Sequence, residues 1–215
     1  MRPKGVILWK NSAVSVKPKA FAKVIPREVH LNKVLPRRDY TPTPQITREY
    51  LLGLLKDATS RNTTYRIATK NKYFCELIKT GIKNLGANSW MYKEGKNRNL
   101  WIVEFSKRLL NNVKVRSRNS KIAFVRGYFD AEGGIAREPQ VRFYIYFCQK
   151  DYEDLKTIKD YLTEFGILSG KIHNPSKKVD PNYWRFYVSS KSYKDFALIV
   201  GSNHPEKSRI LRVKI

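Results

Sequence analysis

Cysteine, histidine and long apolar runs are scarce in this sequence. The two cysteines among 215 residues, Cys75 and Cys148, lack the spacing of metal ligands, and so do the three histidines. We therefore expect both cysteines to be buried small residues in a reducing, cytoplasmic setting. No apolar stretch approaches the roughly 20 residues that a membrane-spanning helix needs, and the first residues lack the apolar core of a secretory signal. We expect no membrane contact.

Acidic residues are also few. The chain has 18 Asp and Glu against 43 Lys and Arg, which gives a formal net charge of +25. Self-repulsion of this size destabilises a compact state unless an anionic partner neutralises it. Because 41% of the residues are hydrophobic and 13% aromatic, most of the chain should still fold. Nucleic acid is favoured as the partner over a membrane surface or an acidic protein.

Residues 1–45 differ in composition from the rest. They contain six of the ten prolines and have a net charge of +8. Such proline spacing leaves no helical or strand period, because each ring removes a donor and restricts the residue before it. We predict an extended basic tail that becomes ordered on a polyanionic partner or on its own domain. The predicted nucleic-acid contacts of the tail are Arg2, Lys4, Lys10, Lys17, Lys19, Lys23, Arg27, Lys33, Arg37 and Arg38.

Beyond the tail, the sequence repeats, with residues 46–118 as the first copy and 119–215 as the second. A helix is predicted after Thr47 in the first copy and after Ser120 in the second, because both are suitable N-caps. Each copy continues with a strand, an amphipathic helix that ends at glycine, further strands and a last helix. The predicted segments are 65–69, 72–85, 100–105 and 107–112, matched by 141–148, 152–165, 184–188 and 192–200. The expected fold is α+β, with two pseudo-symmetric αββαββα repeats.

The heads of the two repeats carry related motifs. Residues 126–134 read Arg-Gly-Tyr-Phe-Asp-Ala-Glu-Gly-Gly, and residues 51–59 read Leu-Leu-Gly-Leu-Leu-Lys-Asp-Ala-Thr. Together with the matching strands around Trp101 and Trp184, these motifs resemble the LAGLIDADG homing endonucleases in their single-chain, two-repeat form. The resemblance covers residues 46–205 and is close in the second motif and degenerate in the first.

The resemblance implies a specific architecture and chemistry. The two signature helices would pack together on a pseudo-twofold axis, with Gly53 and Gly127 allowing their backbones to approach, so the chain would be a pseudo-dimeric monomer. In the family, an acidic residue near each helix end binds Mg²⁺ for phosphodiester hydrolysis, which needs divalent cations to activate water. The flanking sheets form a saddle over DNA.

The first motif departs from this pattern. When the repeats are aligned on their helix glycines, Glu132 falls opposite Ala58, and Asp130 falls opposite Lys56, which adds positive charge where a cation would bind. Alanine cannot hold a metal, and Asp57 is one residue away, about 100° around a helix. No catalytic residue and no metal or other cofactor is therefore expected. Glu132 is the one candidate, with a structural role as its alternative, and Asp57 is doubtful.

The first repeat is also shortened. Gly53 and Gly86 are 33 residues apart, whereas Gly127 and Gly166 are 39 apart. The difference falls directly after the first signature, which leaves little room for the first strand and its turn. We therefore expect the first hairpin of the first sheet to be reduced.

Strand alternation predicts which side chains face the saddle. In the second repeat, the residues predicted to face the helices are Val141, Phe143, Ile145 and Phe147. In the first repeat, the predicted outward residues are Leu100, Ile102 and Glu104, a poor surface for phosphate that the tail would cover. The predicted nucleic-acid contacts of the repeats are Arg66, Lys70, Arg142, Tyr144, Tyr146, Lys150, Arg185, Tyr187 and Lys191.

These observations favour a former endonuclease that binds nucleic acid without cutting it. The basic tail favours structured RNA over DNA, first of all ribosomal RNA within a ribonucleoprotein that also contains ribosomal proteins. An intron maturase and a DNA-binding regulator remain alternatives. A further alternative is an active Mg²⁺-dependent endonuclease that cleaves or nicks DNA through Glu132, alone or with Asp57.

Overall fold

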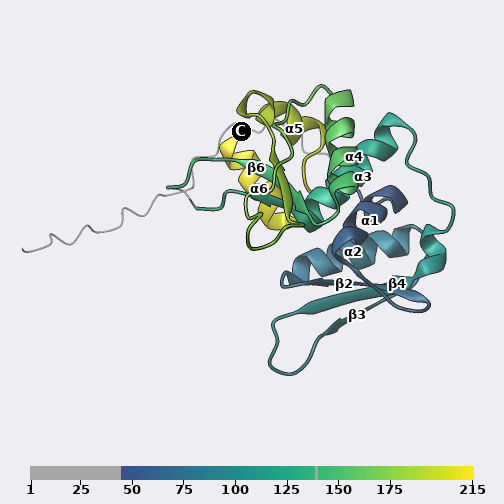
Figure 1. The fold of residues 1–215 in the computed structure, drawn as a ribbon. Helices are drawn as coiled ribbons and strands as arrows, with labels where there is room; N and C mark the ends of the chain where they lie inside the picture. Colours follow the sequence, from purple (N-terminus) through teal and green to yellow (C-terminus); the bar gives the residue numbers. More distant parts are fainter. Residues whose placement is uncertain (1–44, 139) are drawn as a thin grey trace, which may run out of the picture. The chain divides into compact units, whose positions relative to one another are not determined.

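The computed structural model describes residues 45–138 and 140–215 (Figure 1). The predicted contacts of the tail, from Arg2 to Arg38, lie outside the described residues. Within the described ranges, no helix is long and apolar enough to cross a membrane.

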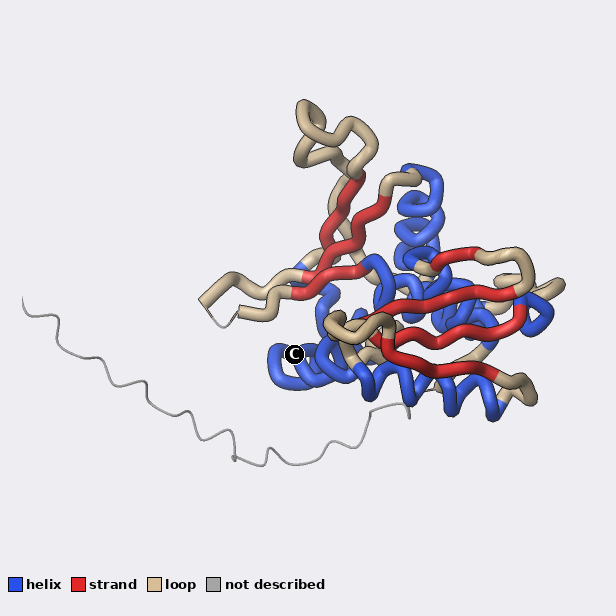
Figure 2. The backbone as a smooth tube through the Cα atoms, turned by 90° about the horizontal axis from the view of Figure 1, so that it is seen from below, coloured by secondary structure: helices blue, strands red, loops and turns tan. Residues whose placement is uncertain are grey.

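The first repeat builds a four-stranded antiparallel sheet with helices on one face. Thr47 begins helix α1, as predicted, and its Oγ1 accepts a hydrogen bond of 3.1 Å from the Tyr50 amide. The sheet has the order β1-β2-β4-β3, and Figure 2 shows it with helix α2 along one face. The elements are α1 (Arg48–Leu54), the 3₁₀ turn η1 (Leu55–Asp57), β1 (Thr59–Ser60), β2 (Thr64–Thr69), α2 (Lys72–Asn84), β3 (Ser89–Lys93), β4 (Trp101–Ser106) and the 3₁₀ turn η2 (Lys107–Leu110).

The second repeat has the same layout with a larger helical layer. Its sheet has the order β5-β6-β7. Isolated bridges of Ser169 with Val188 and of His173 with Arg185 place residues 169–173 beside β7, as β3 lies beside β4. The elements are α3 (Arg118–Glu132), β5 (Gly133–Ile135), β6 (Ile145–Gln149), α4 (Tyr152–Glu164), β7 (Trp184–Tyr187), η3 (Ser190–Ser192), α5 (Tyr193–Ile199) and α6 (Pro205–Lys214).

The predicted α+β repeat is therefore confirmed. Helices α2 and α4 end before Gly86 and Gly166, whose φ angles of 79° and 83° lie in the left-handed region that favours glycine. The reduced first hairpin is confirmed as well, because β1 has only two residues, which pair with Tyr65 and Arg66 of β2.

The starts of two elements differ from the predictions by three residues or more, and the last helix of the first repeat, predicted over 107–112, is the 3₁₀ turn η2. Helix α3 begins after Ser117 instead of Ser120, because the Ser117 Oγ accepts the Ser120 amide at 3.1 Å. Strand β6 begins at Ile145 instead of residue 141. The carbonyl of Phe143 accepts the Tyr193 hydroxyl at 3.2 Å instead of a strand partner, and Val141, predicted to face inward, is 42% exposed. Helix α6 was not predicted.

Each repeat has its own apolar core, and the central helices join them. The first core lies between α1, α2 and β2–β4, and the second lies between α3–α6 and β5–β7. A Cβ on Gly53 would lie 2.1 Å from the Phe124 carbonyl oxygen, and one on Gly127 would lie 2.0 Å from that of Tyr50. The predicted glycine contact is thus confirmed, and α1 and α3 lie side by side (Figure 1).

Candidate nucleic-acid interface and central acidic site

Both central helical segments end on an acidic residue. Helix α3 ends at Glu132, and α1 with its 3₁₀ turn ends at Asp57. The residues that follow, Gly133 and Ala58, are both extended, with ψ angles of 149° and 151°. A 3₁₀ turn advances by about 120° per residue, whereas an α-helix advances by about 100°. The segment that ends at Asp57 therefore completes its last turn in one residue fewer than α3, which ends at Glu132. Asp57, and not Ala58, is therefore the structural counterpart of Glu132, contrary to the alignment on glycines.

Lys56 does not occupy the acidic site. Its Nζ lies 2.7 Å from each carboxylate oxygen of Asp154 on α4. The expectation that Lys56 places positive charge at the cation position is therefore wrong, because the 3₁₀ turn rotates this side chain toward the second repeat. The Lys56–Asp154 ion pair instead links the two repeats.

Glu132 is partly buried and hydrogen-bonded. One of its carboxylate oxygens accepts the Gln149 amide at 3.0 Å. Partial burial and the nearby Asp57 carboxylate both raise the pKa of Glu132. Partial burial also raises the pKa of Asp57, while the Lys207 ammonium lowers it. The two acids and Lys207 therefore form one electrostatic cluster.

Asp130, the other acid of the second motif, is a buried structural residue. Its carboxylate accepts the Tyr50 hydroxyl at 2.7 Å, the Asn203 amide at 2.9 Å and the His204 amide at 3.2 Å, and the Ser202 hydroxyl donates to it as well. These donors come from α1 and from the loop before α6. Asp130 therefore connects the two central helices to the C-terminal segment.

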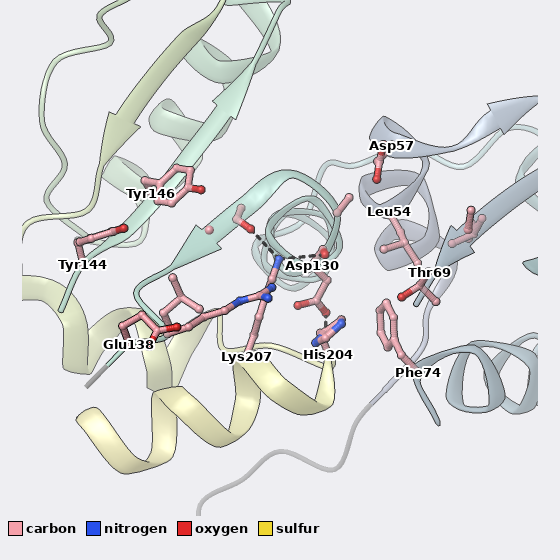
Figure 3. A pocket seen from close by; sticks show the side chains of 17 residues that line it. Leu54, Asp57, Thr69, Phe74, Asp130, Glu138, Tyr144, Tyr146, His204 and Lys207 are labelled. Atoms are coloured by element: carbon pink, nitrogen blue, oxygen red, sulfur yellow. Dashed lines mark hydrogen bonds between the residues drawn. The ribbon is translucent and has the colours of Figure 1, made fainter. Parts of the chain in front are cut away.

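Lys207 of α6 reaches the end of α3. Its side chain is almost completely buried, and its Nζ donates to the carbonyl oxygens of Phe129, Asp130 and Gly133 at 2.6, 3.0 and 2.6 Å (Figure 3). Carbonyls at a helix C-terminus have no helical partner and carry partial negative charge. Burial lowers the pKa of Lys207 to about 8. Sequence reasoning missed this residue because it missed α6, although Pro205 is a typical first-turn residue.

A cavity of about 540 Å³ opens between the repeats beside these groups (Figure 3). Asp57 is among its lining residues, and His204 packs against Phe74 with ring centroids 4.7 Å apart and the rings tilted by 55°. The residues that line it are Leu54, Asp57, Ile67, Ala68, Thr69, Phe74, Asp130, Ala131, Gly133, Gly134, Ile135, Arg137, Glu138, Tyr144, Tyr146, His204 and Lys207.

The donors at this site do not fit a pair of metal ions. Among residues 45–138 and 140–215, no three His, Cys, Asp or Glu side chains lie close enough together to hold one ion. Asp57 and Glu132 are the two carboxylates at the helix ends, and a Glu132 oxygen is already bonded to Gln149. The ammonium of Lys207 lies against the Gly133 carbonyl directly after Glu132.

The outer face of the second sheet carries a cluster that we call the tyrosine face. It consists of Tyr144, Tyr146, Tyr183, Arg185 and Tyr187. The guanidinium of Arg185 donates to the Tyr187 hydroxyl at 3.1 Å and to the Tyr183 hydroxyl at 2.5 Å. It also lies 4.7 Å from the centroid of the Tyr146 ring, within the range of a cation–π contact.

Further rings extend this face. The Tyr144 ring lies 5.8 Å from that of Tyr146 and 5.9 Å from that of Tyr187. The His173 ring stacks on Tyr187 at 6.0 Å. The structure thus brings together four predicted contacts, Tyr144, Tyr146, Arg185 and Tyr187, and adds Tyr183 and His173. Period-two alternation puts Tyr183 on the same face as Arg185 and Tyr187, whereas nothing in the sequence marked His173.

The remaining predicted contacts are dispersed. Lys70, Arg142, Lys150 and Lys191 are exposed beyond the ends of strands. Arg66, by contrast, forms an ion pair with Glu94 on the first sheet. It is therefore already neutralised and is a poor site for phosphate.

On the first sheet, the carboxylate of Glu104 is satisfied by neighbouring strands, a pairing that strand alternation did not predict. Glu104 accepts the hydroxyls of Thr64 at 2.6 Å and Tyr92 at 2.9 Å. Ile102, predicted to face outward under the tail, is fully buried among the described residues alone. It is paired in register with Tyr92 on β3, and directly opposite side chains of neighbouring strands contact each other.

Comparisons with known proteins agree with this architecture. Residues 119–201 match the sequence model of the LAGLIDADG-like domain. No curated protein sequence matches the chain. The structure is similar to I-DmoI in complex with DNA and Mn, at 19% identity and a TM-score of 0.53 over 72% of this chain and 95% of that one.

A second group of similar structures is that of DUF199/WhiA. Its N-terminal LAGLIDADG domain is 17% identical, with a TM-score of 0.57 over 74% of this chain and 84% of that one. The full-length protein from Thermatoga maritima is also 17% identical, with a TM-score of 0.59 over 81% of this chain and 62% of that one. Residues 119–201 thus match a LAGLIDADG-like domain, and the fold of the described part of the chain is similar to those of I-DmoI and the LAGLIDADG domain of DUF199/WhiA.

Proposed function

We propose that this protein binds nucleic acid on the tyrosine face and does not cleave it. The observation that carries the proposal is the set of three tyrosine rings around Arg185, with Tyr144 beside two of them. Stacking of a base on an aromatic side chain contributes about 1–3 kcal/mol, and a guanidinium adds affinity for phosphate and for π-faces. Arg142, Lys150 and Lys191 of the same repeat are exposed and add positive charge to it.

Structured RNA is the target that this face fits better than duplex DNA. In a DNA duplex the bases are stacked on each other, and proteins read their edges in the grooves. Loops and bulges of RNA instead present unstacked bases that can lie on tyrosine or arginine. The net charge of +25 and the basic composition of residues 1–45 favour a large, densely phosphorylated partner. Ribosomal RNA in a cytoplasmic ribonucleoprotein is the first candidate.

The central site supports binding without hydrolysis. Divalent cations lower the pKa of bound water and stabilise the leaving oxygen in phosphodiester hydrolysis. Asp57 and Glu132 are the two carboxylates that would hold such ions, yet Glu132 is bonded to Gln149, and the Lys207 ammonium lies nearby. The Gln149 bond and the nearby ammonium therefore leave fewer free oxygen donors and more positive charge than a site for divalent cations favours.

An active endonuclease is the second candidate, and one observation favours it. Asp57 and Glu132 end the two central helical segments at equivalent places, so an acid is present on both sides of the axis. The similar I-DmoI structure contains DNA and Mn. This candidate is tested by incubating the protein with Mg²⁺ and double-stranded DNA of its host gene without the intron. A cut or nick that is lost in Glu132→Gln would replace the proposed function.

The binding proposal is tested with fluorescence-labelled RNA. A hairpin with an unpaired loop should bind more tightly than a fully paired duplex of the same length and charge. Tyr144→Ala and Tyr187→Ala should each weaken binding to the hairpin by about tenfold, the loss of roughly 1.4 kcal/mol of stacking. Tyr73→Ala is the matched control, because Tyr73 is 66% exposed on α2. Equal affinities of all three variants would contradict the proposal.

A further inference from the structure

We propose that Lys207 is the built-in counter-ion of the acids at the central helix ends and that it excludes a divalent cation from them. This inference rests on the proposed non-cleaving function and deepens it, since it names the residue that replaces the metal. The acids concerned are Asp57 and Glu132, which approach each other from the two repeats.

The hydrogen bonds of Lys207 fix its ammonium at this place. An ammonium has three N–H donors and no acceptor. All three are used, because Nζ contacts the carbonyl oxygens of Phe129, Asp130 and Gly133 at 2.6–3.0 Å. The aliphatic part of the side chain lies against the Phe129 ring, with Nζ 4.9 Å from its centroid. Nothing in this arrangement leaves the ammonium free to move to solvent.

The loop before α6 positions this lysine. Asn203 and His204 donate their backbone amides to the buried Asp130 carboxylate, and Lys207 follows one helical turn later. The same acid thus anchors the start of α6, while its carbonyl oxygen accepts Lys207. Asp130 and Lys207 therefore act as one unit that seats α6 against the end of α3.

The charges around Lys207 are those of a counter-ion site. Asp130 and Glu132 attract the ammonium, and Lys207 in turn stabilises the charged form of Asp57. Arg137, which faces the same cavity, adds a second positive group and pairs with Glu206 at 3.7 Å. A divalent ion at Asp57 and Glu132 would meet this positive charge in a partly desolvated cavity, where Coulomb repulsion is strong.

Lys207 also occupies the oxygen atoms that an ion would need. Mg²⁺ and Mn²⁺ bind through one or two carboxylates, further oxygens and water. The carbonyl oxygen of Gly133, which directly follows Glu132 in the chain, is a further oxygen at this helix end, and it accepts Lys207. Removal of the ammonium would leave the Asp130 and Gly133 carbonyl oxygens without this donor, while the Phe129 oxygen would still accept the Gly133 amide.

The test is a Mn²⁺ titration of the full chain, followed by electron paramagnetic resonance of the free ion. The wild type should bind no Mn²⁺ through Asp57 or Glu132, so wild type and Asp57→Asn should give the same titration. Lys207→Met has a side chain of similar length without the charge. This variant should gain a Mn²⁺ site whose dissociation constant is at least about tenfold lower than that of any Mn²⁺ binding by the wild type. Adding Asp57→Asn to Lys207→Met should remove that site, whereas Lys207→Arg should not create it.

Two results would overturn the inference. One is a Mn²⁺ site in the wild type that Asp57→Asn abolishes, which can be measured even if Lys207→Met does not fold. The other is a folded Lys207→Met protein with no gain in Mn²⁺ binding. Neither result depends on the affinity for RNA, so this inference can fail while RNA binding on the tyrosine face is confirmed. Loss of RNA binding would likewise leave the Mn²⁺ result unaffected.

Discussion

The Tyr50 hydroxyl donates a buried hydrogen bond of 2.7 Å to the Asp130 carboxylate and so joins the two central helices. Burial and the Asp130 charge raise the pKa of Tyr50 well above its usual value, so the hydroxyl remains a donor. Both residues lie at the junction of the two cores. The bond therefore couples the stability of one repeat to that of the other.

Tyr50→Phe should destabilise the protein by about 1–3 kcal/mol, because it leaves one buried carboxylate without its donor from α1. The ring and its packing are kept, so the loss reports on the hydrogen bond. Urea unfolding followed by circular dichroism measures the change. Tyr73→Phe is the control, since that hydroxyl is on an exposed side chain. An unchanged unfolding midpoint for Tyr50→Phe would contradict a coupling role.

Gly53→Ala should destabilise the central helix pair by about 3 kcal/mol or more, the upper range for an added methyl that meets fixed backbone. Its Cβ would lie 2.1 Å from the Phe124 carbonyl oxygen, and α1 would have to move away from α3. Gly170→Ala is the matched control, because its nearest neighbour would be 3.7 Å away. Thermal unfolding of both variants distinguishes them, and equal melting temperatures would show that the helices separate without cost.

His204 should make stability depend on pH between about 4 and 6.5. Burial, followed by the charges of Lys207 and Arg137, lowers the pKa of His204 from 6.5 to about 4. In that window the unfolded chain binds more protons than the folded one, so the free energy of unfolding falls as the pH falls. The loss should total at most about 3 kcal/mol, at 1.36 kcal/mol per pKa unit.

Urea unfolding at several pH values between 4 and 7 tests this dependence. In His204→Gln the titrating ring is absent, so the slope of stability against pH should be smaller than in the wild type. The other carboxylates titrate in both proteins, so their contribution to the slope is the same and cancels when the two slopes are compared. Parallel slopes would show that His204 is protonated in the folded state as easily as in the unfolded one.

The repeat and its helix ends follow from local sequence signals, whereas the central site does not. Thr47, Gly86 and Gly166 act through bonds and φ angles within a few residues, so their roles are readable from the sequence. The position of Asp57 depends on a single 3₁₀ turn, and an alignment that assumes a regular helix misplaces both Asp57 and Lys56. The pairing of Lys56 with Asp154 and of Arg66 with Glu94 also depends on contacts between distant segments.

At the tyrosine face, too, local patterns could be predicted from the sequence, whereas contacts between distant segments could not. Period-two alternation placed Arg185 and Tyr187 outward, and β7 has that pattern. The irregular start of β6 was not readable, because it results from the contact of Phe143 with Tyr193, 50 residues away. Lys207 was missed for a related reason: its role exists only once α6 lies against the end of α3.

Deletion of residues 1–45 should weaken RNA binding and reduce its dependence on salt. The segment carries ten basic residues, and each phosphate that they neutralise adds about 0.7–0.9 to the slope of log affinity against log salt. Fluorescence anisotropy in increasing KCl measures the slope for the full chain and for residues 46–215. Replacing only Lys17, Lys19 and Lys23 by Gln should reduce the slope by about 2–3 if each of them neutralises one phosphate. If the slope is the same in the truncated protein, residues 46–215 alone neutralise the RNA phosphates, and the prediction for the tail is wrong.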